Sequence, residues 1–267
     1  MNKMSIVLYK IHKGIQFLSQ YPKIGKFIGS LLGLLEVPIL DFIYFMDRHI
    51  SPGSYQKSMK MFSLFYGSKV IPLDVKIEGI PTIAPTEEIM SLIRRMPAVS
   101  IGYCYCRDKE KNCNNPIWTC IHIGIAKHLE ELGGKIPLKS SSIEEVQKLL
   151  QETDKLGLVH QLLTAPNPEY IYVICNCCPC CCVMLRNAIN FNHHGSALPS
   201  SFIVSFNHTN CNNCGICVER CYFGCLSIVN NILSINNEKC AGCGLCISSC
   251  KEDALSLVKR ISEKSYN

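Results

Sequence analysis

Apolar residues at helical spacing dominate the first part of the chain. They recur at its start, at Ile6, Tyr9, Ile15 and Leu18, and they crowd into residues 27–46. A recurrence every three to four residues is typical of one face of a helix. We therefore predict a helical N-terminal region over residues 1–80, which contain no cysteine.

The apolar stretch over residues 27–46 is long enough to span a bilayer, but Glu36, Pro38 and Asp41 interrupt it. A spanning helix needs about 20 apolar residues with few or no charges. The pattern favours a buried pair of helices broken near Pro38. The alternative is a helix that lies on a membrane surface or docks on a partner, so membrane-surface contact through this region stays open.

Helix and strand signals alternate over residues 81–200. Ser142 followed by Glu145 is a capping-box pattern, and Gly157 is suited to end the helix that starts there. The expected helices cover residues 86–96, 120–132 and 142–156, and the expected strands cover residues 98–105 and 170–174. This alternation predicts a small cysteine-rich α/β domain within a chain of the α+β class.

The cysteine content changes the picture, because 19 of the 267 residues are cysteine. Disulfides need an oxidising compartment. Lys3 could open a secretory signal, but no compact apolar stretch with a small-residue cleavage site follows it. We therefore expect a cytoplasmic protein whose cysteines hold metal rather than form disulfides.

Residues 201–267 contain an internal repeat of cysteines. The spacing C-x2-C-x2-C-x3-C occurs twice, displaced by 29 residues, and each copy has a glycine after its second cysteine, Gly215 and Gly244. A glycine permits the tight loop that three neighbouring thiolates need in order to wrap one face of a metal cluster. The two copies are Cys211, Cys214, Cys217 and Cys221, and Cys240, Cys243, Cys246 and Cys250.

This repeat closely resembles the bacterial-type ferredoxins that carry two [4Fe–4S] clusters. In that family the fourth cysteine of each run binds the other cluster. The resemblance implies one cluster on Cys211, Cys214, Cys217 and Cys250, and a second on Cys240, Cys243, Cys246 and Cys221. A pair of zinc sites is the alternative, but structural zinc gains nothing from a third cysteine two residues further on.

The chain departs from the ferredoxin pattern at three positions. The family usually has proline after each fourth cysteine, where Tyr222 and Lys251 stand here. This difference alters a turn but removes no ligand. Cys225 aligns with Ala254 of the other copy, so we expect it to be a buried spare thiol rather than a ligand.

Ten further cysteines lie in the middle region, and we expect them to bind metal. The strings C-Y-C-R and I-C-N-C-C-P-C-C-C resemble those of a little-characterised group of prokaryotic 4Fe–4S-binding proteins. One or two additional iron–sulfur clusters is the preferred interpretation; zinc, a thiol-based redox or persulfide site, and simple packing are the alternatives. The ten are Cys104, Cys106, Cys113, Cys120, Cys175, Cys177, Cys178, Cys180, Cys181 and Cys182.

Other residues near these cysteines carry weaker signals. Arg107 follows Cys106 and could neutralise cluster charge, or it could be an ordinary surface arginine. His122 and His160 are the histidines nearest the metal chemistry, although histidine most often fills an ordinary structural position. If residues 175–177 are extended, Cys175 and Cys177 point to the same side.

Charge and missing motifs narrow the function. Formal net charge is +6, and the first 60 residues hold eight Lys or Arg against three Asp or Glu. The basic residues are dispersed, so no nucleic-acid partner is indicated. Neither a dinucleotide-binding nor an NTP-binding loop is present, which favours redox partner proteins as the electron source.

These features predict an iron–sulfur protein that relays single electrons through two [4Fe–4S] clusters. Two alternatives remain open at this point. One is an oxidoreductase whose active site is an unusual cysteine-ligated metal centre, with the ferredoxin domain as its electron supply. The other is a redox or metal sensor in which the loss of a cluster changes partner docking.

Overall fold

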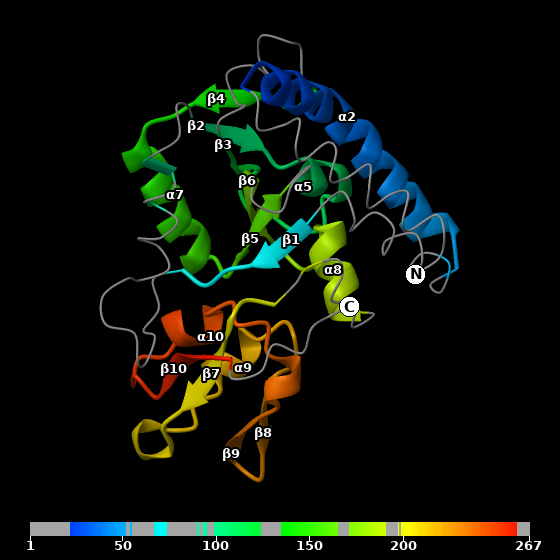
Figure 1. The fold of residues 1–267 in the computed structure, drawn as a ribbon. Helices are drawn as coiled ribbons and strands as arrows, with labels where there is room; N and C mark the ends of the chain where they lie inside the picture. The colour runs from blue at the N-terminus through cyan, green and yellow to red at the C-terminus, as the bar shows by residue number, and fades with distance from the viewer. Residues whose placement is uncertain are drawn as a thin grey trace.

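The computed structural model describes residues 22–51, 54, 67–73, 90, 93–94, 99–123, 135–164, 171–190, 197 and 199–260. The helical pattern predicted over residues 6–18 and most of the helix predicted over residues 86–96 lie outside these residues. The described chain mixes helices and strands in two packed units, with the cysteine-repeat unit below the larger one in Figure 1.

A six-stranded sheet forms the centre of the larger unit, in the order β1-β5-β6-β3-β2-β4. Every neighbouring pair of strands is antiparallel. The strands are β1 (Gly67–Val70), β2 (Val99–Tyr103), β3 (Trp118–Ile123), β4 (Leu138–Ser140), β5 (Val159–Thr164) and β6 (Ile171–Cys177).

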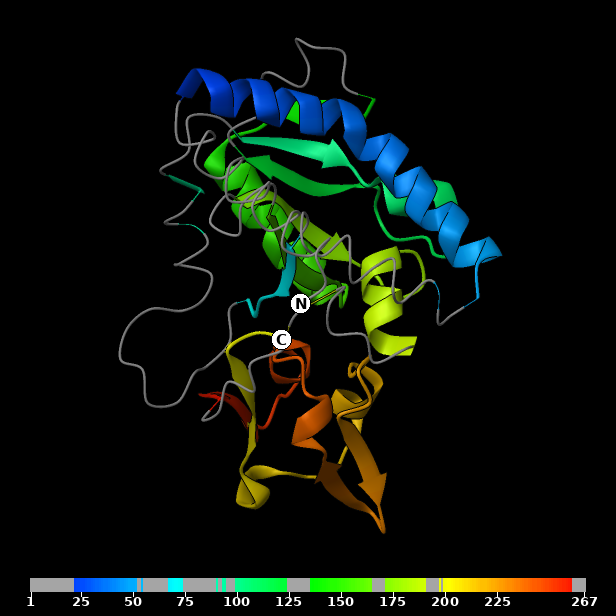
Figure 2. The same cartoon turned by 45° about the vertical axis from the view of Figure 1, so that its right-hand side comes forward.

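The two faces of this sheet are covered differently. Helix α7 (Ile143–Lys155) packs on one face, where Val146 and Leu150 join a core with Ile121 and Ile174 of the sheet. Helix α2 (Pro22–His49) runs across the other face, as Figure 2 shows. Because side chains alternate along a strand, the cysteines of β3 and β6 lie on the α2 side.

Helix α7 begins as the capping box predicted. The Glu145 amide donates to Ser142 Oγ at 3.2 Å, and the Ser142 amide donates to the Glu145 carboxylate at 2.9 Å. Gly157, with φ of 77°, follows the helix in the left-handed region that glycine favours. The strands predicted over residues 98–105 and 170–174 are present as β2 and β6, of which β6 continues to Cys177.

Residues 22–49 form one long helix where a broken pair was predicted, and residues 67–70 of the predicted helical region form strand β1 instead. Helix α2 continues through Pro38, because a proline removes one N–H donor but the remaining hydrogen bonds hold the helix. Ile43, Tyr44 and Met46 are buried, whereas Phe42 and Phe45 on its outer side are 50% and 56% exposed. Across the residues that the structure describes, no helix is long and apolar enough to cross a membrane.

The helix predicted over residues 120–132 is also wrong at its start. Residues 118–123 form strand β3, which pairs with β2 on one side and β6 on the other. Ile121 and Ile123 face the α7 core, and Cys120 and His122 face α2. This alternation is that of a strand buried on both faces. A short apolar run in the sequence fits such a strand and a buried helix equally well. Residues 124–132 lie outside the described residues.

Ion pairs fasten α2 to two shorter helices, α5 (Tyr105–Glu110) and α8 (Val183–Asn190). Arg186 of α8 pairs with Asp47 of α2 and lies 3.2 Å from the Glu110 carboxylate of α5. Lys109 of α5 pairs with Asp41 of α2. These contacts hold α2 over the sheet face that carries the cysteines.

The cysteine-repeat unit has approximate twofold symmetry. Each pair of strands joins the two halves of the repeat: β7 pairs with β10, and β8 pairs with β9. Asn207 and Asn236, 29 residues apart, cap equivalent 3₁₀ turns with their side chains. The elements are β7 (Phe202–Phe206), η1 (His208–Asn210), α9 (Ile216–Glu219), β8 (Leu226–Val229), β9 (Ile232–Ile235), η2 (Asn237–Lys239), α10 (Leu245–Ser248) and β10 (Leu255–Lys259).

This unit packs on the larger one through specific contacts. Arg220 donates to the carbonyl oxygens of Asp154 and Lys155, both at 3.0 Å. Leu245 of α10 shares a buried cluster with Leu185 of α8. The two sets of cysteines are therefore held at a fixed separation.

Candidate metal centres

In the cysteine-repeat unit, four cysteines from both halves line one cavity of about 380 Å³. Three come from the first copy of the repeat and the fourth, Cys250, comes from the second. The Asn213 amide donates to Cys211 Sγ at 3.4 Å. The four are Cys211, Cys214, Cys217 and Cys250.

A second cavity, of about 350 Å³, mirrors the first. Its fourth cysteine, Cys221, comes from the first copy. The Val204 amide donates to Cys240 Sγ at 3.4 Å, and the Cys225 amide donates to Cys221 Sγ at 3.3 Å. The four are Cys221, Cys240, Cys243 and Cys246.

Cys225 lies at the edge of this second cavity and is 3% exposed. Hydrogen bonding from its thiol lowers the pKa of Cys221 to about 6 and that of Cys240 to about 7. The same bonds, with burial, raise the pKa of Cys225 itself. Cys225 is thus a neutral donor beside two thiolates, which agrees with the predicted buried spare thiol.

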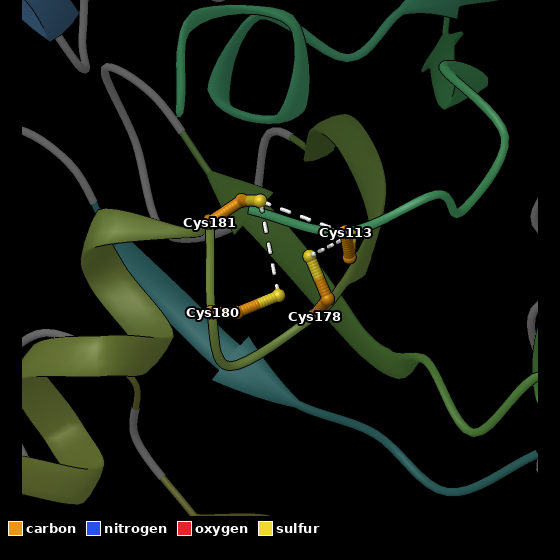
Figure 3. Close-up of side chains that lie close together, drawn as sticks. All are labelled: Cys113, Cys178, Cys180 and Cys181. Atoms are coloured by element: carbon orange, nitrogen blue, oxygen red, sulfur yellow. Dashed lines mark hydrogen bonds between the residues drawn. The ribbon is translucent and has the colours of Figure 1, made fainter. Parts of the chain in front are cut away.

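The ten cysteines of the middle region separate into two groups in space. The first, called here the tetracysteine group, consists of Cys113, Cys178, Cys180 and Cys181, whose sulfur atoms all lie within 4.8 Å of one another. Figure 3 shows them converging from the loop after α5 and the turn after β6.

The remaining six cysteines line a cavity that is larger than the two in the cysteine-repeat unit and lies between the sheet and α2. We call it the six-cysteine chamber, and it encloses about 990 Å³ of space not filled by protein atoms, part of it open to solvent. Cys175 and Cys177 alternate along β6 and both line it, as the extended pattern predicted. The six are Cys104, Cys106, Cys120, Cys175, Cys177 and Cys182.

The thiols of the chamber form a connected set. Hydrogen bonds from the Cys104 and Cys175 thiols hold the pKa of the buried Cys120 thiol well below its usual range. The hydrogen bond with Cys182 raises the pKa of Cys106, and the one with Cys175 raises that of Cys177. Six neighbouring thiols cannot all ionise in the protein interior unless a cation compensates for their charge. They therefore match the donor set of a metal centre.

Apolar side chains supply most of the remaining wall. Ile39, Leu40 and Ile43 of α2 cover the chamber from above. Gln161 reaches it from β5, with its amide nitrogen 4.0 Å from Cys182 Sγ. His122 also lines it, and burial lowers the pKa of this imidazole to about 4, so it is neutral at pH 7.

Arg107 lies between the two groups and is 2% exposed, so the surface-arginine interpretation is wrong. Its guanidinium donates to Thr119 Oγ1 and to the Asn176 carbonyl oxygen, both at 2.9 Å. Burial alone would lower its pKa, but the thiols of Cys104, Cys178 and Cys120 raise it. The positive charge of Arg107 therefore interacts with thiols of both cysteine groups.

His160 has a structural role in the described chain. It is fully buried, and its Nδ1 lies 2.6 Å from the Asn176 side-chain oxygen. Asn176 donates in turn to the Thr119 carbonyl oxygen. This network fixes the backbone between Cys175 and Cys177 from the face opposite the chamber.

Tyr222 connects the two units and was noted in the sequence only as a departure from proline. It packs in the cluster that also contains Cys243 and Leu245. Burial raises its pKa, and the nearby thiols of Cys178, Cys180 and Cys243 add to that effect. One aromatic ring thus lies between the second cavity of the cysteine-repeat unit and the tetracysteine group.

Comparison with known protein families supports the metal chemistry of the C-terminal unit. A model described as a 4Fe–4S binding domain matches residues 233–256. No curated protein matches the chain. The matched segment contains four of the cysteines described above, so the chain is an iron–sulfur protein with a site for at least one [4Fe–4S] cluster.

The loop around the second cavity depends on Gly242. This residue has φ of 65°, and an added Cβ would lie 2.1 Å from Ser200 Oγ and 2.2 Å from the Phe202 carbonyl oxygen. Gly224 has φ of 64°, but nothing lies within 4 Å of its added Cβ. A substitution at Gly224 therefore adds backbone strain alone, whereas a substitution at Gly242 adds both backbone strain and a steric clash.

We expect Gly224→Ala to lower the free energy of unfolding by about 1 kcal/mol, through left-handed strain alone. Gly242→Ala should lower it by about 2–4 kcal/mol, because the clash adds to that strain. Chemical denaturation of the metal-loaded protein measures both values. Equal losses for the two variants would contradict the packing described here.

Proposed function

We propose that this protein relays single electrons through two [4Fe–4S] clusters in its C-terminal unit to a metal centre in the six-cysteine chamber. When bound, a [4Fe–4S] cluster supplies a one-electron carrier. The observation that carries the proposal is the pair of similar cavities, each lined by four cysteines of the duplicated spacing, with Cys225 as a fifth cysteine in the second. Three cysteines in each cavity come from one copy of the repeat and one comes from the other.

The surroundings of these cysteines suit bound clusters. Backbone amides donate to Cys211, Cys221 and Cys240, which stabilises thiolate charge. Burial raises the pKa of Cys246 in the second cavity, and the thiol of Cys217 in the first cavity is close enough to add to that effect. Close spacing of the two ligand sets favours rapid passage of an electron between them.

The first cavity is the proposed entrance for electrons. Cys214 on its rim is exposed, and the neighbouring Ile216 is 41% exposed. An exposed ligand beside an apolar side chain offers a redox partner protein a place to dock. The second cavity lies deeper, with Cys240 9% exposed, and adjoins the larger unit through Tyr222.

The six-cysteine chamber is the proposed destination. Tyr222 joins the second cavity to the tetracysteine group, and Arg107 contacts the surroundings of both middle groups. Arg107 offsets part of the negative charge that thiolate ligands and an added electron bring into the protein interior. The chain thus keeps its cysteine groups in a continuous order from the exposed rim to the chamber.

An oxidoreductase is the second candidate, and the shape of the chamber favours it. Most metal sites that only carry electrons are closed, whereas this one adjoins a large apolar cavity under α2. Such a cavity could admit a small molecule of low polarity. On this account Gln161 and the neutral His122 are the polar groups available to orient it.

The ligand assignment of the C-terminal unit is tested by two cysteine variants. Cys221→Ala should remove one cluster, lowering the iron bound to this unit from about eight atoms to about four. Cys225→Ala should leave both clusters in place, because this thiol acts only as a donor. Iron and sulfide analysis after anaerobic purification measures the outcome, and the opposite pattern would overturn the assignment.

The chamber is tested by a thiol and an apolar wall residue that both line it. Cys177→Ser should remove the iron in excess of the ferredoxin iron, and with it any spectral change on adding carbon monoxide. Val173→Ala is the matched control, because it shortens a neighbouring side chain of β6 and removes no ligand. If Cys177→Ser retained all its iron, the chamber would not be a metal centre.

A response to carbon monoxide separates the two candidate functions. A shift of the visible or electron paramagnetic resonance spectrum would indicate an open coordination position and favour the oxidoreductase. A chamber loaded with metal but insensitive to carbon monoxide would favour pure electron transfer.

A further inference from the structure

We propose that the tetracysteine group binds a single tetrahedral zinc ion and no iron–sulfur cluster. Zinc has no redox chemistry, so the ion would hold the protein between the second cavity and the six-cysteine chamber in place without itself carrying an electron. The inference rests on the distances between the four sulfur atoms, on the residues that surround them and on the segments that they join.

The sulfur atoms have the spacing of ligands to one ion. Cys113 Sγ lies 3.6 Å from Cys178 Sγ and 3.9 Å from Cys181 Sγ, and Cys180 Sγ lies 3.8 Å from Cys181 Sγ. With metal–sulfur bonds of about 2.3 Å, the edge of a regular tetrahedron of sulfurs is about 3.8 Å. These three edges agree with that value, and the other three are no longer than 4.8 Å.

A cubane cluster requires a wider arrangement. Each of its four thiolates binds a different iron at a different corner, so the width of the cluster separates the sulfurs. Within the described part of the chain, the tetracysteine group is the one group whose ligand atoms all lie within 4.8 Å of one another. The two ferredoxin sets instead surround cavities of about 380 and 350 Å³.

A disulfide does not explain the short distances. A disulfide has its sulfurs about 2.05 Å apart, and all 19 cysteines of the chain are free thiols. Four free thiols in van der Waals contact, on a turn and a loop 65 residues apart, gain little from packing alone. A bound cation accounts for their convergence.

The surroundings of the group support thiolate ligands. Asn115 Nδ2 donates to Cys113 Sγ at 3.5 Å. The buried Arg107 adjoins Cys178, so it offsets part of the charge of −2 that four thiolates and a divalent ion carry.

The backbone around the group is also fixed in place. Asn112 Nδ2 donates to the Cys180 carbonyl oxygen at 3.0 Å, and the Tyr44 hydroxyl donates to the Cys181 carbonyl oxygen at 2.7 Å. The Tyr44 bond brings α2 into contact with the turn that carries three of the four ligands. A rigid backbone is what a structural metal site needs in order to hold its ligands before the ion binds.

Zinc is the ion that this donor set favours. A tetrahedral set of four sulfurs is typical of zinc, and zinc binds more tightly than ferrous iron to the same ligands. The ion would clamp the loop after α5 to the turn between β6 and α8. That turn lies between Cys177 and Cys182 of the six-cysteine chamber, so the clamp fixes the chamber wall.

The test uses the full-length protein, purified without air and analysed for zinc, iron and sulfide. The wild type should contain about one zinc ion per chain. Cys113→Ser should lose that zinc while its iron and sulfide stay unchanged. Cys113→His should keep it, because histidine is also a zinc ligand, and Cys225→Ser, which changes a thiol outside the group, should keep it too.

A cobalt measurement tests the site without a substitution, in case a variant fails to fold. Replacing the zinc of the wild type with Co²⁺ should produce the intense visible absorption of tetrahedral thiolate coordination. Loss of about four iron atoms with their sulfide from Cys113→Ser would overturn the proposal. Loss of one iron atom from Cys113→Ser would also overturn it. So would a wild-type protein that contains no zinc and takes up no cobalt.

Discussion

The constraint on which this structure depends is the repulsion between thiolates. Eighteen of the 19 cysteines lie in four groups, and Cys214 is the one exposed member of these groups. Thiolates brought together in a protein interior repel one another and lose hydration, so bound cations must compensate for them. The fold supplies the rest of the compensation through backbone amides, Asn115 and the buried Arg107.

The spatial order of the two cavities in the cysteine-repeat unit and the six-cysteine chamber gives the molecule its proposed direction of electron flow. The exposed rim at Cys214 lies at one end, and the chamber under α2 lies at the other. Tyr222 stands where the two units meet, and Arg220 fixes their contact by donating to two carbonyl oxygens at the end of α7. The same contact that joins the units therefore sets the distance that an electron must cross.

The sequence was most informative where ligands are close together in the chain. The resemblance to two-cluster ferredoxins, carried by the duplicated cysteine spacing, implied that Cys250 and Cys221 belong to opposite sets, and the structure places them in separate cavities. Local chemistry also predicted the capping box at Ser142 and the strand that ends at Cys177. In each case a few neighbouring residues determine the geometry.

Sequence spacing was less informative where distant segments meet. Nothing local shows that Cys113 joins Cys178 while Cys104 and Cys106 face Cys182, because β-sheet pairing decides which cysteines share a face. Cys120 was placed on a helix because a short apolar run fits both periods, and the burial of Arg107 depends on contacts with Thr119 and Asn176.

The proposed electron transfer requires two clusters side by side in the C-terminal unit. Electron paramagnetic resonance of the dithionite-reduced, anaerobically purified protein tests it most directly. Two reduced clusters held this close should give a broadened spectrum with the splitting of two interacting spins. The simple spectrum of one isolated cluster, unchanged at full reduction, would contradict the account.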